Sequence, residues 1–239
     1  MDFPLDRYTY QARLLPALIT FAPLAFAVAV WFPGETATWN WFGTLFISLG
    51  LAALLSQLGR DLGKRKESLL LQQWGGVPTT KTLSHRLSRL NALTLKRYHL
   101  KLQTLLPELK IPSASEEAQD HSATNKVYDS CVHFLREKTR DRKQFPVIFA
   151  ENINFGFRRN LWALKPFGIP SSLIGVFSCG LAIIHRSQGN PSALLLSIVG
   201  TVISAVLFLL WLAVFNPNWV RIPADAYAER LLGSLDNLE

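Results

Sequence analysis

The sequence predicts an all-α membrane protein, with four transmembrane helices in two hairpins and a helical cytosolic insertion between the hairpins. Three observations favour this fold class. Hydrophobic residues make up 49% of the 239 residues and the mean hydropathy is +0.17, a composition typical of membrane insertion. Four apolar stretches are each long enough to cross a bilayer. A polar, basic stretch from residue 59 to residue 166 separates the first pair of apolar stretches from the second.

These stretches divide the chain into four predicted segments. Residues 1–58 form an N-terminal transmembrane hairpin, residues 59–166 a basic cytosolic helical domain, residues 167–215 a C-terminal transmembrane hairpin, and residues 216–239 an amphipathic cytosolic tail. The mixed acidic, basic and aromatic residues of the first 13 positions are typical of a membrane interface rather than of a signal peptide. We therefore expect residues 14–32 to be a permanent helix that just covers a hydrocarbon core of about 30 Å.

The first hairpin closes through the short turn of residues 33–38, whose only charge is Glu35. Trp31, Trp39 and Trp41 flank this turn as an aromatic belt of the kind found at membrane interfaces. Small residues recur along the second expected span, residues 39–58. They either let helix backbones approach closely or line a pore, and the sequence leaves both interpretations open.

The second hairpin comprises the expected spans of residues 167–185 and 193–215, joined by the turn of residues 186–192. The first of these spans carries small side chains at helical spacing, which favours a central helix in contact with several others. This face is predicted to form a pore or a helix interface, through Ser171, Gly175, Ser178, Cys179 and Ala182. The turn carries a single cation, so the positive-inside rule places it outside the cell.

Positive charge is concentrated in the basic stretch. Residues 59–166 hold 20 Lys/Arg and 10 Asp/Glu, a net charge of +10, against +8 for the whole chain. The positive-inside rule therefore makes this stretch and both termini cytoplasmic. The cations between Arg60 and Lys66 either determine this topology or also bind an anionic lipid or nucleotide.

Leu residues recur at helical spacing from Lys81 to Leu106, with cations mostly off their stripe, which predicts one basic amphipathic helix of about 26 residues. These cations are the expected contacts for an anionic ligand: Arg86, Arg89, Lys96, Arg97 and Lys101. The alternative is an ordinary solvated helix face. Arg158 and Arg159, in an aromatic and basic string before the third span, are further candidates for an anion site, or else part of an elbow at the membrane interface.

The remainder of the cytosolic part is predicted as a loop over residues 107–123 and a second amphipathic helix over residues 125–142, while residues 145–149 fit either a strand or a helix start. Residues 223–238 have the spacing of a short amphipathic helix. We expect that helix to pack on the basic stretch of its own chain or of a neighbouring subunit.

Motifs that carry chemistry are not found. The Gly75-Gly76 turn lacks the Lys-Ser/Thr ending of a phosphate-binding loop, and Cys131 and His133 have no second cluster at zinc-ligand spacing. We expect no cofactor, no metal and no enzymatic activity. The four spans hold no strongly acidic or basic side chain, which disfavours a charge-relay transporter.

Two apolar hairpins around a basic helical stretch give this chain an architecture that resembles the membrane channel effectors of bacterial anti-phage systems, in particular the nucleotidyltransferase-linked Hailong type. The resemblance implies a homo-oligomeric ion channel of the bacterial inner membrane, in contact with membrane lipid. Its basic domain would bind an anionic nucleotide or oligonucleotide, or a cytosolic partner protein. The alternatives are a non-conducting adaptor that recruits such a partner and an enzyme that modifies lipids or nucleotides.

Overall fold

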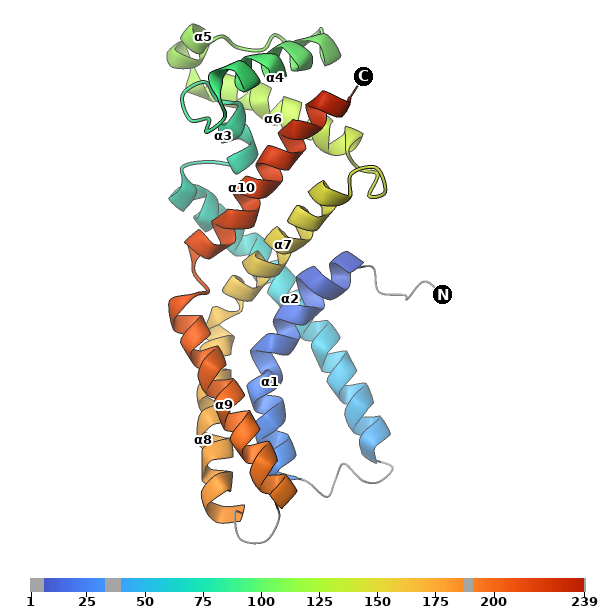
Figure 1. The fold of residues 1–239 in the computed structure, drawn as a ribbon, viewed down its shortest axis with the longest axis vertical. Helices are drawn as coiled ribbons and strands as arrows, with labels where there is room; N and C mark the ends of the chain where they lie inside the picture. The colour runs from blue at the N-terminus through green and yellow to red at the C-terminus, as the bar shows by residue number, and fades with distance from the viewer. Residues whose placement is uncertain (1–6, 33–39, 187–190, 239) are drawn as a thin grey trace. The chain divides into compact units, whose positions relative to one another are not determined.

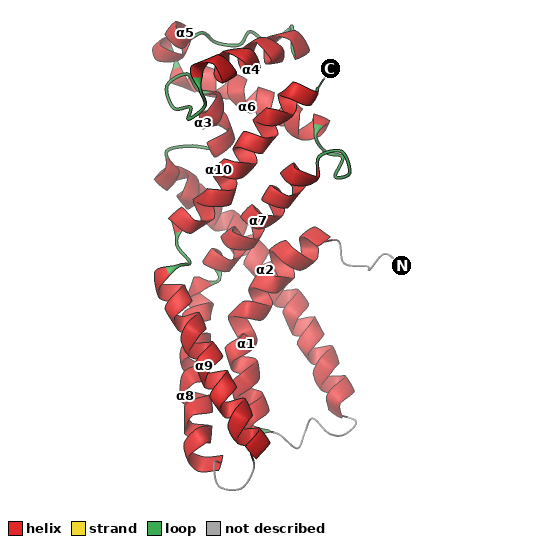
Figure 2. Cartoon of the chain, viewed as in Figure 1, coloured by secondary structure: helices red, strands yellow, loops and turns green. Residues whose placement is uncertain are grey.

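The computed structural model describes residues 7–32, 40–186 and 191–238, and at residues 40–49, 51, 52, 55 and 186 it describes the backbone alone. Every regular element in these ranges is a helix (Figure 2). The predicted turn of residues 33–38, the start of the second expected span at Trp39, and most of the turn of residues 186–192 lie outside the described residues.

The helices follow one another without a strand in the described part of the chain. In order they are η1 (Thr9–Leu14), α1 (Leu15–Trp31), α2 (Asn40–Trp74), α3 (Pro78–Leu83), α4 (Ala92–Leu105), α5 (Ala114–Gln119), α6 (His121–Lys138), α7 (Pro146–Ala163), α8 (Lys165–Arg186), α9 (Pro191–Ala213), α10 (Pro217–Gly233) and η2 (Ser234–Asn237) (Figure 1). Of these, η1 is a π-helix and η2 a 3₁₀-helix.

The chain forms two compact units. The first, which we call the membrane unit, comprises Met1–Glu67 and Gly156–Val220, and the second, the helical unit, comprises Ser68–Phe155 and Arg221–Glu239. Three helices of the membrane unit are long and apolar enough to cross a bilayer: Thr9–Trp31, Lys165–His185 and Pro191–Ala213. Residues 40–58 are helical as part of α2, but the fourth span and the layout in two hairpins stay predictions, as do the predicted segment boundaries.

Helices α1, α8 and α9 pack together in the membrane unit through small residues (Figure 1). A Cβ atom built on Gly175 of α8 would lie 2.4 Å from Ser204 Oγ on α9 and 2.7 Å from Pro23 Cβ on α1. A Cβ atom on Gly200 of α9 would lie 2.8 Å from Cys179 Sγ. The three backbones therefore approach one another at positions where only glycine fits.

The helical unit has a conventional apolar core. Leu83, Leu102, Tyr128, Leu135 and Leu231 are each fully buried within it, from α3, α4, α6 and α10. The prediction that the C-terminal amphipathic helix packs on the basic part of its own chain is confirmed, because its apolar residues complete this core. The second predicted amphipathic helix is confirmed as α6, and residues 145–149 prove to be a helix start, since α7 begins at Pro146.

The predicted 26-residue basic helix is wrong. Helix α3 ends at Leu83 and α4 begins only at Ala92, with Asn91 capping it through a 2.8 Å bond from the Leu93 N–H. Residues 84–91 between them form an irregular loop, the α3–α4 loop. The predicted loop of residues 107–123 in turn holds the short helix α5, which begins with a capping box between Ser113 and Glu116.

Candidate functional site

A buried carboxylate fixes the α3–α4 loop. Glu117, on α5, is 5% exposed and accepts hydrogen bonds from the hydroxyl of Ser84, the backbone N–H of His85 at 2.7 Å and the hydroxyl of Tyr128 at 3.1 Å. Burial acts to raise the pKa of Glu117, but these hydrogen bonds outweigh it and lower the pKa below its ordinary value. Glu117 is therefore a stable anion that holds the loop in place.

Two histidines complete this network. The Nε2 atom of His99 lies 2.8 Å from the carbonyl oxygen of Leu83, and its ring meets that of His85 edge to face at 4.6 Å. Burial lowers the pKa of His99. The ring is thus neutral at physiological pH and ties α4 to the end of α3, next to the loop that carries two of the predicted anion-binding residues.

The predicted anion-binding residues divide into two groups. Arg86 and Arg89 lie on the α3–α4 loop, whereas Lys96, Arg97 and Lys101 lie on α4. Arg89 pairs with Asp225 of α10 at 3.0 Å and Arg97 with Asp236 of η2 at 2.9 Å. Within the described residues, Arg86, Lys96 and Lys101 show no such ion pair, and the first two are exposed. These five cations therefore face water or the acids of the C-terminal segment.

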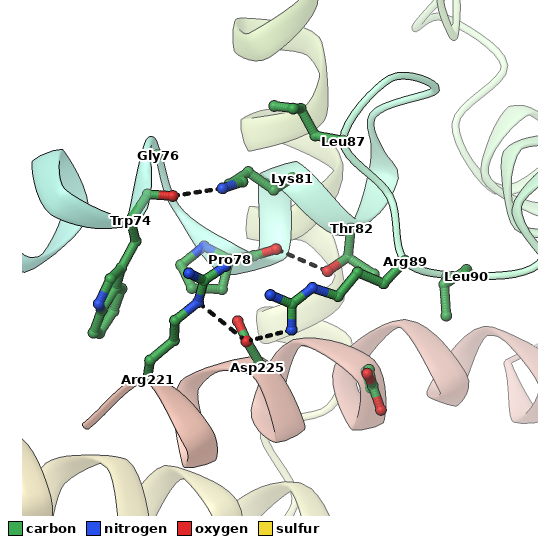
Figure 3. A pocket seen from close by; sticks show the side chains of 11 residues that line it. Trp74, Gly76, Pro78, Lys81, Thr82, Leu87, Arg89, Leu90, Arg221 and Asp225 are labelled. Atoms are coloured by element: carbon green, nitrogen blue, oxygen red, sulfur yellow. Dashed lines mark hydrogen bonds and ion pairs between the residues drawn. The ribbon is translucent and has the colours of Figure 1, made fainter. Parts of the chain in front are cut away.

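Asp225 is shared by two guanidinium groups (Figure 3). Arg221 Nε lies 3.3 Å from the same carboxylate oxygen that Arg89 contacts. Lys81 stands in the same pocket and donates to the carbonyl oxygen of Trp74. Burial lowers the pKa of Lys81, and the charge of Arg221 lowers it further. A carboxylate of the protein itself thus occupies the point where Arg89 of the loop and Arg221 of α10 meet.

The other two predicted anion-binding residues, Arg158 and Arg159, belong to the membrane unit, whereas the five cations described above belong to the helical unit. Arg158 lies over the ring of Trp219 at 4.8 Å and donates to its carbonyl oxygen. Arg159 is 8% exposed and pairs with Glu67 at 2.6 Å, and it also contacts the amide oxygen of Asn160. Both guanidinium groups are therefore engaged with other residues of the membrane unit.

The predicted pore or interface face of α8 is turned into the bundle. Ser171, Cys179 and Ala182 are each no more than 2% exposed, Gly175 meets α1 and α9, and Ser178 accepts a 2.9 Å hydrogen bond from Trp31 Nε1. This face is therefore filled by helices of the same chain.

Sequence reasoning missed Glu117, Arg221 and Asp225. Glu117 and Asp225 lie far along the chain from the loop residues that they contact, Arg221 is placed through Asp225, and neither periodicity nor a motif indicates these contacts. A weak signal existed for Asp225, because the tail was expected to pack on the basic stretch and carries acids. In the described part of the chain, no three His, Cys, Asp or Glu side chains gather as metal ligands.

Comparison with known proteins adds no relative. Neither a protein-family model, nor a curated protein, nor a solved structure matches this chain.

Proposed function

We propose that this chain is an oligomeric effector of the bacterial inner membrane, an ion channel gated through its basic helical unit by an anionic nucleotide or oligonucleotide, or by a partner protein. Its role in defence rests on the architectural resemblance described above. The division into a unit with three candidate spans and a unit with its own core supports a membrane protein with a separate sensing part. We take both termini and the helical unit to be cytoplasmic, as the charge distribution favours.

The observation that carries this proposal is the pair of exposed bridges between the predicted anion-binding residues and the C-terminal segment. The side chain of Arg89 is 66% exposed and that of Arg97 is 60% exposed while they contact Asp225 and Asp236. Ion pairs at such exposure are worth about 0–1 kcal/mol each. A ligand with several phosphates therefore competes for these guanidinium groups at little cost, because it replaces one weak anion by a stronger one.

Such competition supplies what gating requires. A ligand shifts a conformational equilibrium only if it binds one state better than the other. In one state Asp225 and Asp236 pair with Arg89 and Arg97, so the anion site is partly occupied. In the other state the ligand binds these arginines, and α10 and η2 lose two of their contacts. Each tenfold preference of the ligand for the second state shifts the equilibrium by about 1.4 kcal/mol.

Ion flux from proteoliposomes tests the proposal. A mixed-sequence oligonucleotide, present on both sides of the bilayer, should change the flux of the wild-type protein. Arg89→Ala with Arg97→Ala should weaken the response about tenfold or more, because charge-assisted contacts are lost. Asp225→Asn with Asp236→Asn should strengthen it, since the competing anions are removed. The exposed Lys126 of α6 provides the control, because Lys126→Ala removes a cation elsewhere.

A non-conducting adaptor is the second candidate, and α8 provides the observation that favours it. Its small face is buried, and its exposed side chains are apolar, including Ile174, Phe177 and Ile184 at 51%, 68% and 72% exposure. Such a surface suits lipid or another subunit better than a water-filled pore. Flux that stays at background under every ligand condition, together with a cytosolic protein that copurifies stoichiometrically, would reject the channel in favour of the adaptor.

A further inference from the structure

The pocket around Asp225 lies within the helical unit and surrounds one carboxylate with positive charge (Figure 3). Three cations line it, Lys81 from α3, Arg89 from the α3–α4 loop and Arg221 from α10. Among the described residues, its two acids are Asp225, between the two guanidinium groups, and Glu229, which is exposed. The cations therefore outnumber the acids, and one of the acids is solvated.

Asp225 uses little of the hydrogen-bonding capacity of its two arginines. Arg89 Nη1 lies 3.0 Å and Arg221 Nε lies 3.3 Å from the same carboxylate oxygen, Oδ2. Each guanidinium group thus contacts the carboxylate through one nitrogen and shares its acceptor with the other, whereas an arginine fork matches two oxygens at once. An anion with more oxygens engages both forks better than this carboxylate does.

Lys81 adds a third positive charge at the same place. Its ammonium group donates to the carbonyl oxygen of Trp74, and an ammonium group has further N–H donors. Burial lowers the pKa of Lys81, the charges of Arg221 and Arg89 lower it as well, and the charge of Asp225 does not offset them. A second negative charge at this point is therefore stabilised by the cations that Asp225 leaves unbalanced.

Little room remains beside Asp225. The open volume of the pocket is about 30 Å³, which admits about one or two water molecules. A phosphate group does not fit while the carboxylate is in place. The space of the carboxylate and of this cavity together suits one such group, so Asp225 and a phosphate exclude each other from the pocket.

We infer that this pocket binds the terminal phosphate of a nucleotide or oligonucleotide ligand, in the place that Asp225 occupies. The inference rests on the proposed function and names the group of the ligand that the pocket recognises. A terminal phosphate offers three strong acceptor oxygens and about two negative charges at pH 7. An internal phosphodiester carries about one charge, as Asp225 does, and gains less from replacing it. Arg221 and Lys81 are thereby further contacts of the ligand, together with Arg89.

The exposure of the two predicted bridges supports this assignment. At the Asp225 pocket the side chains of Arg221 and Asp225 are only 29% and 27% exposed, so the end of a strand reaches this point more readily than a strand that continues on both sides. The bridge of Arg97 with Asp236 is more open, at 60% and 46% exposure. Arg97 therefore suits an internal phosphate, whereas the Asp225 pocket suits a terminal one.

Binding of two matched oligonucleotides to the full chain in detergent, at fixed ionic strength, tests the inference. They share one mixed sequence and an internal fluorescent label, and they differ only in carrying a phosphate or a hydroxyl at both ends. We expect the phosphorylated form to bind about tenfold more tightly. R221A should remove most of this preference and change the affinity of the hydroxyl form little. K81Q, which keeps a donor for the Trp74 carbonyl but loses the charge, should reduce the preference in part.

Arg230 provides the matched control, because it is an exposed arginine of the same helix outside the pocket lining. R230A should keep the full preference for the phosphorylated form. Unchanged thermal unfolding establishes that each variant is folded. If R221A melts at a lower temperature, Arg221→Lys takes its place, and since it keeps the charge but loses the planar fork, it should show an intermediate preference.

The outcomes separate this inference from the proposed function. A preference that R221A loses and R230A keeps supports the inference. Equal binding of the two forms by the wild type, or a preference that R221A retains in full, overturns the inference and leaves the proposed function standing. Binding of neither form removes the oligonucleotide from the proposed function, and the inference with it.

Discussion

The two units of this protein carry positive charge for different purposes. Counted along the sequence, the membrane unit holds 10 Lys/Arg and 5 Asp/Glu, a net charge of +5, whereas the helical unit holds 15 and 12, a net charge of only +3. In the membrane unit the excess comes from the flanks of its helices, such as Arg60 and Lys165, where it suits topology. In the helical unit the acidic residues nearly balance the basic ones. Its arginines can therefore pair with acids of the same unit, as Arg89 does with Asp225.

The units also pack by different means. The membrane unit brings helices together at glycines, since a lipid-facing exterior leaves no hydrophobic gain from burying large side chains. The helical unit buries large apolar residues, and inside them one ionised carboxylate with its hydrogen-bond donors. The first unit should therefore be sensitive to added volume and the second to lost polar partners.

Removal of Glu117 should have the largest effect. E117A removes the acceptor of the His85 N–H and leaves the buried hydroxyls of Ser84 and Tyr128 without theirs, so we expect a loss of about 3 kcal/mol in stability of the helical unit. Hydrogen–deuterium exchange should rise at residues 84–91, while α8 and α9 keep their protection. Glu108, an exposed acid of the same unit, provides the control as E108A. Equal protection of the loop in E117A and wild type would show that the carboxylate does not organise it.

Added volume at Gly175 should have the next largest effect, confined to the membrane unit. G175A places a methyl group against Ser204 and Pro23, and overpacking of this kind costs about 1–3 kcal/mol. The melting temperature in detergent should fall. Gly180, on the same helix, has nothing within 4 Å of its Cβ position, so G180A should be neutral or slightly stabilising because alanine favours helix. Equal melting of the two variants would contradict the tight approach of α1, α8 and α9.

Acidification should weaken the helical unit in a defined window. The folded pKa of His99 is lowered, so below the ordinary value of about 6.5 the unfolded chain binds a proton first. Stability is complete above that pH and falls as the pH decreases toward the folded pKa, by at most about 1.4 kcal/mol per pH unit. H99Q should abolish this slope in unfolding experiments between pH 7.5 and about 5. Replacement of the exposed His133 by Gln should leave it intact.

The exposed bridge between Arg97 and Asp236 should matter least for stability. R97A should change the free energy of unfolding by about 0.5 kcal/mol or less, because both side chains are about half exposed or more. Added salt should remove even this difference. A loss above about 1.5 kcal/mol would mean that this bridge carries the attachment of η2 and is not readily exchanged for a ligand.

Local pattern was enough to predict much of the fold. The apolar stretches of residues 14–32, 167–185 and 193–215 correspond to the three candidate spans, because a long uncharged helix is favoured in a bilayer whatever its neighbours are. The helix stop at Gly75 and Gly76 is equally local, since both adopt positive φ, of 70° and 124°. The second amphipathic helix and the packing of the C-terminal tail follow from helical periodicity in the same way.

The break between α3 and α4 was not predictable from the pattern of Leu residues. The apolar residues of the sequence around positions 84–91 have helical spacing. In the structure, however, the Glu117 carboxylate accepts hydrogen bonds from the side chain of Ser84, 33 residues away, and from the backbone N–H of His85. Side-chain to backbone bonds of this kind compete with helix formation. The sequence therefore predicted Arg86 and Arg89 as anion contacts on a helix. Their place on a loop instead depends on Glu117, which is distant in the chain.

The sequence by itself determined the positions of the long apolar stretches, of the charged residues and of the amphipathic helices. These features are local, because each is a property of one helix and needs no contact with another. Only the tertiary structure decided which charges meet. Asp225 reaches Arg89 across 136 positions of the chain, and Asp236 reaches Arg97 across 139. Electrostatic interactions depend on distance and exposure in the folded chain, so which arginines the acids of the C-terminal segment reach is fixed by the packing of α10 and η2.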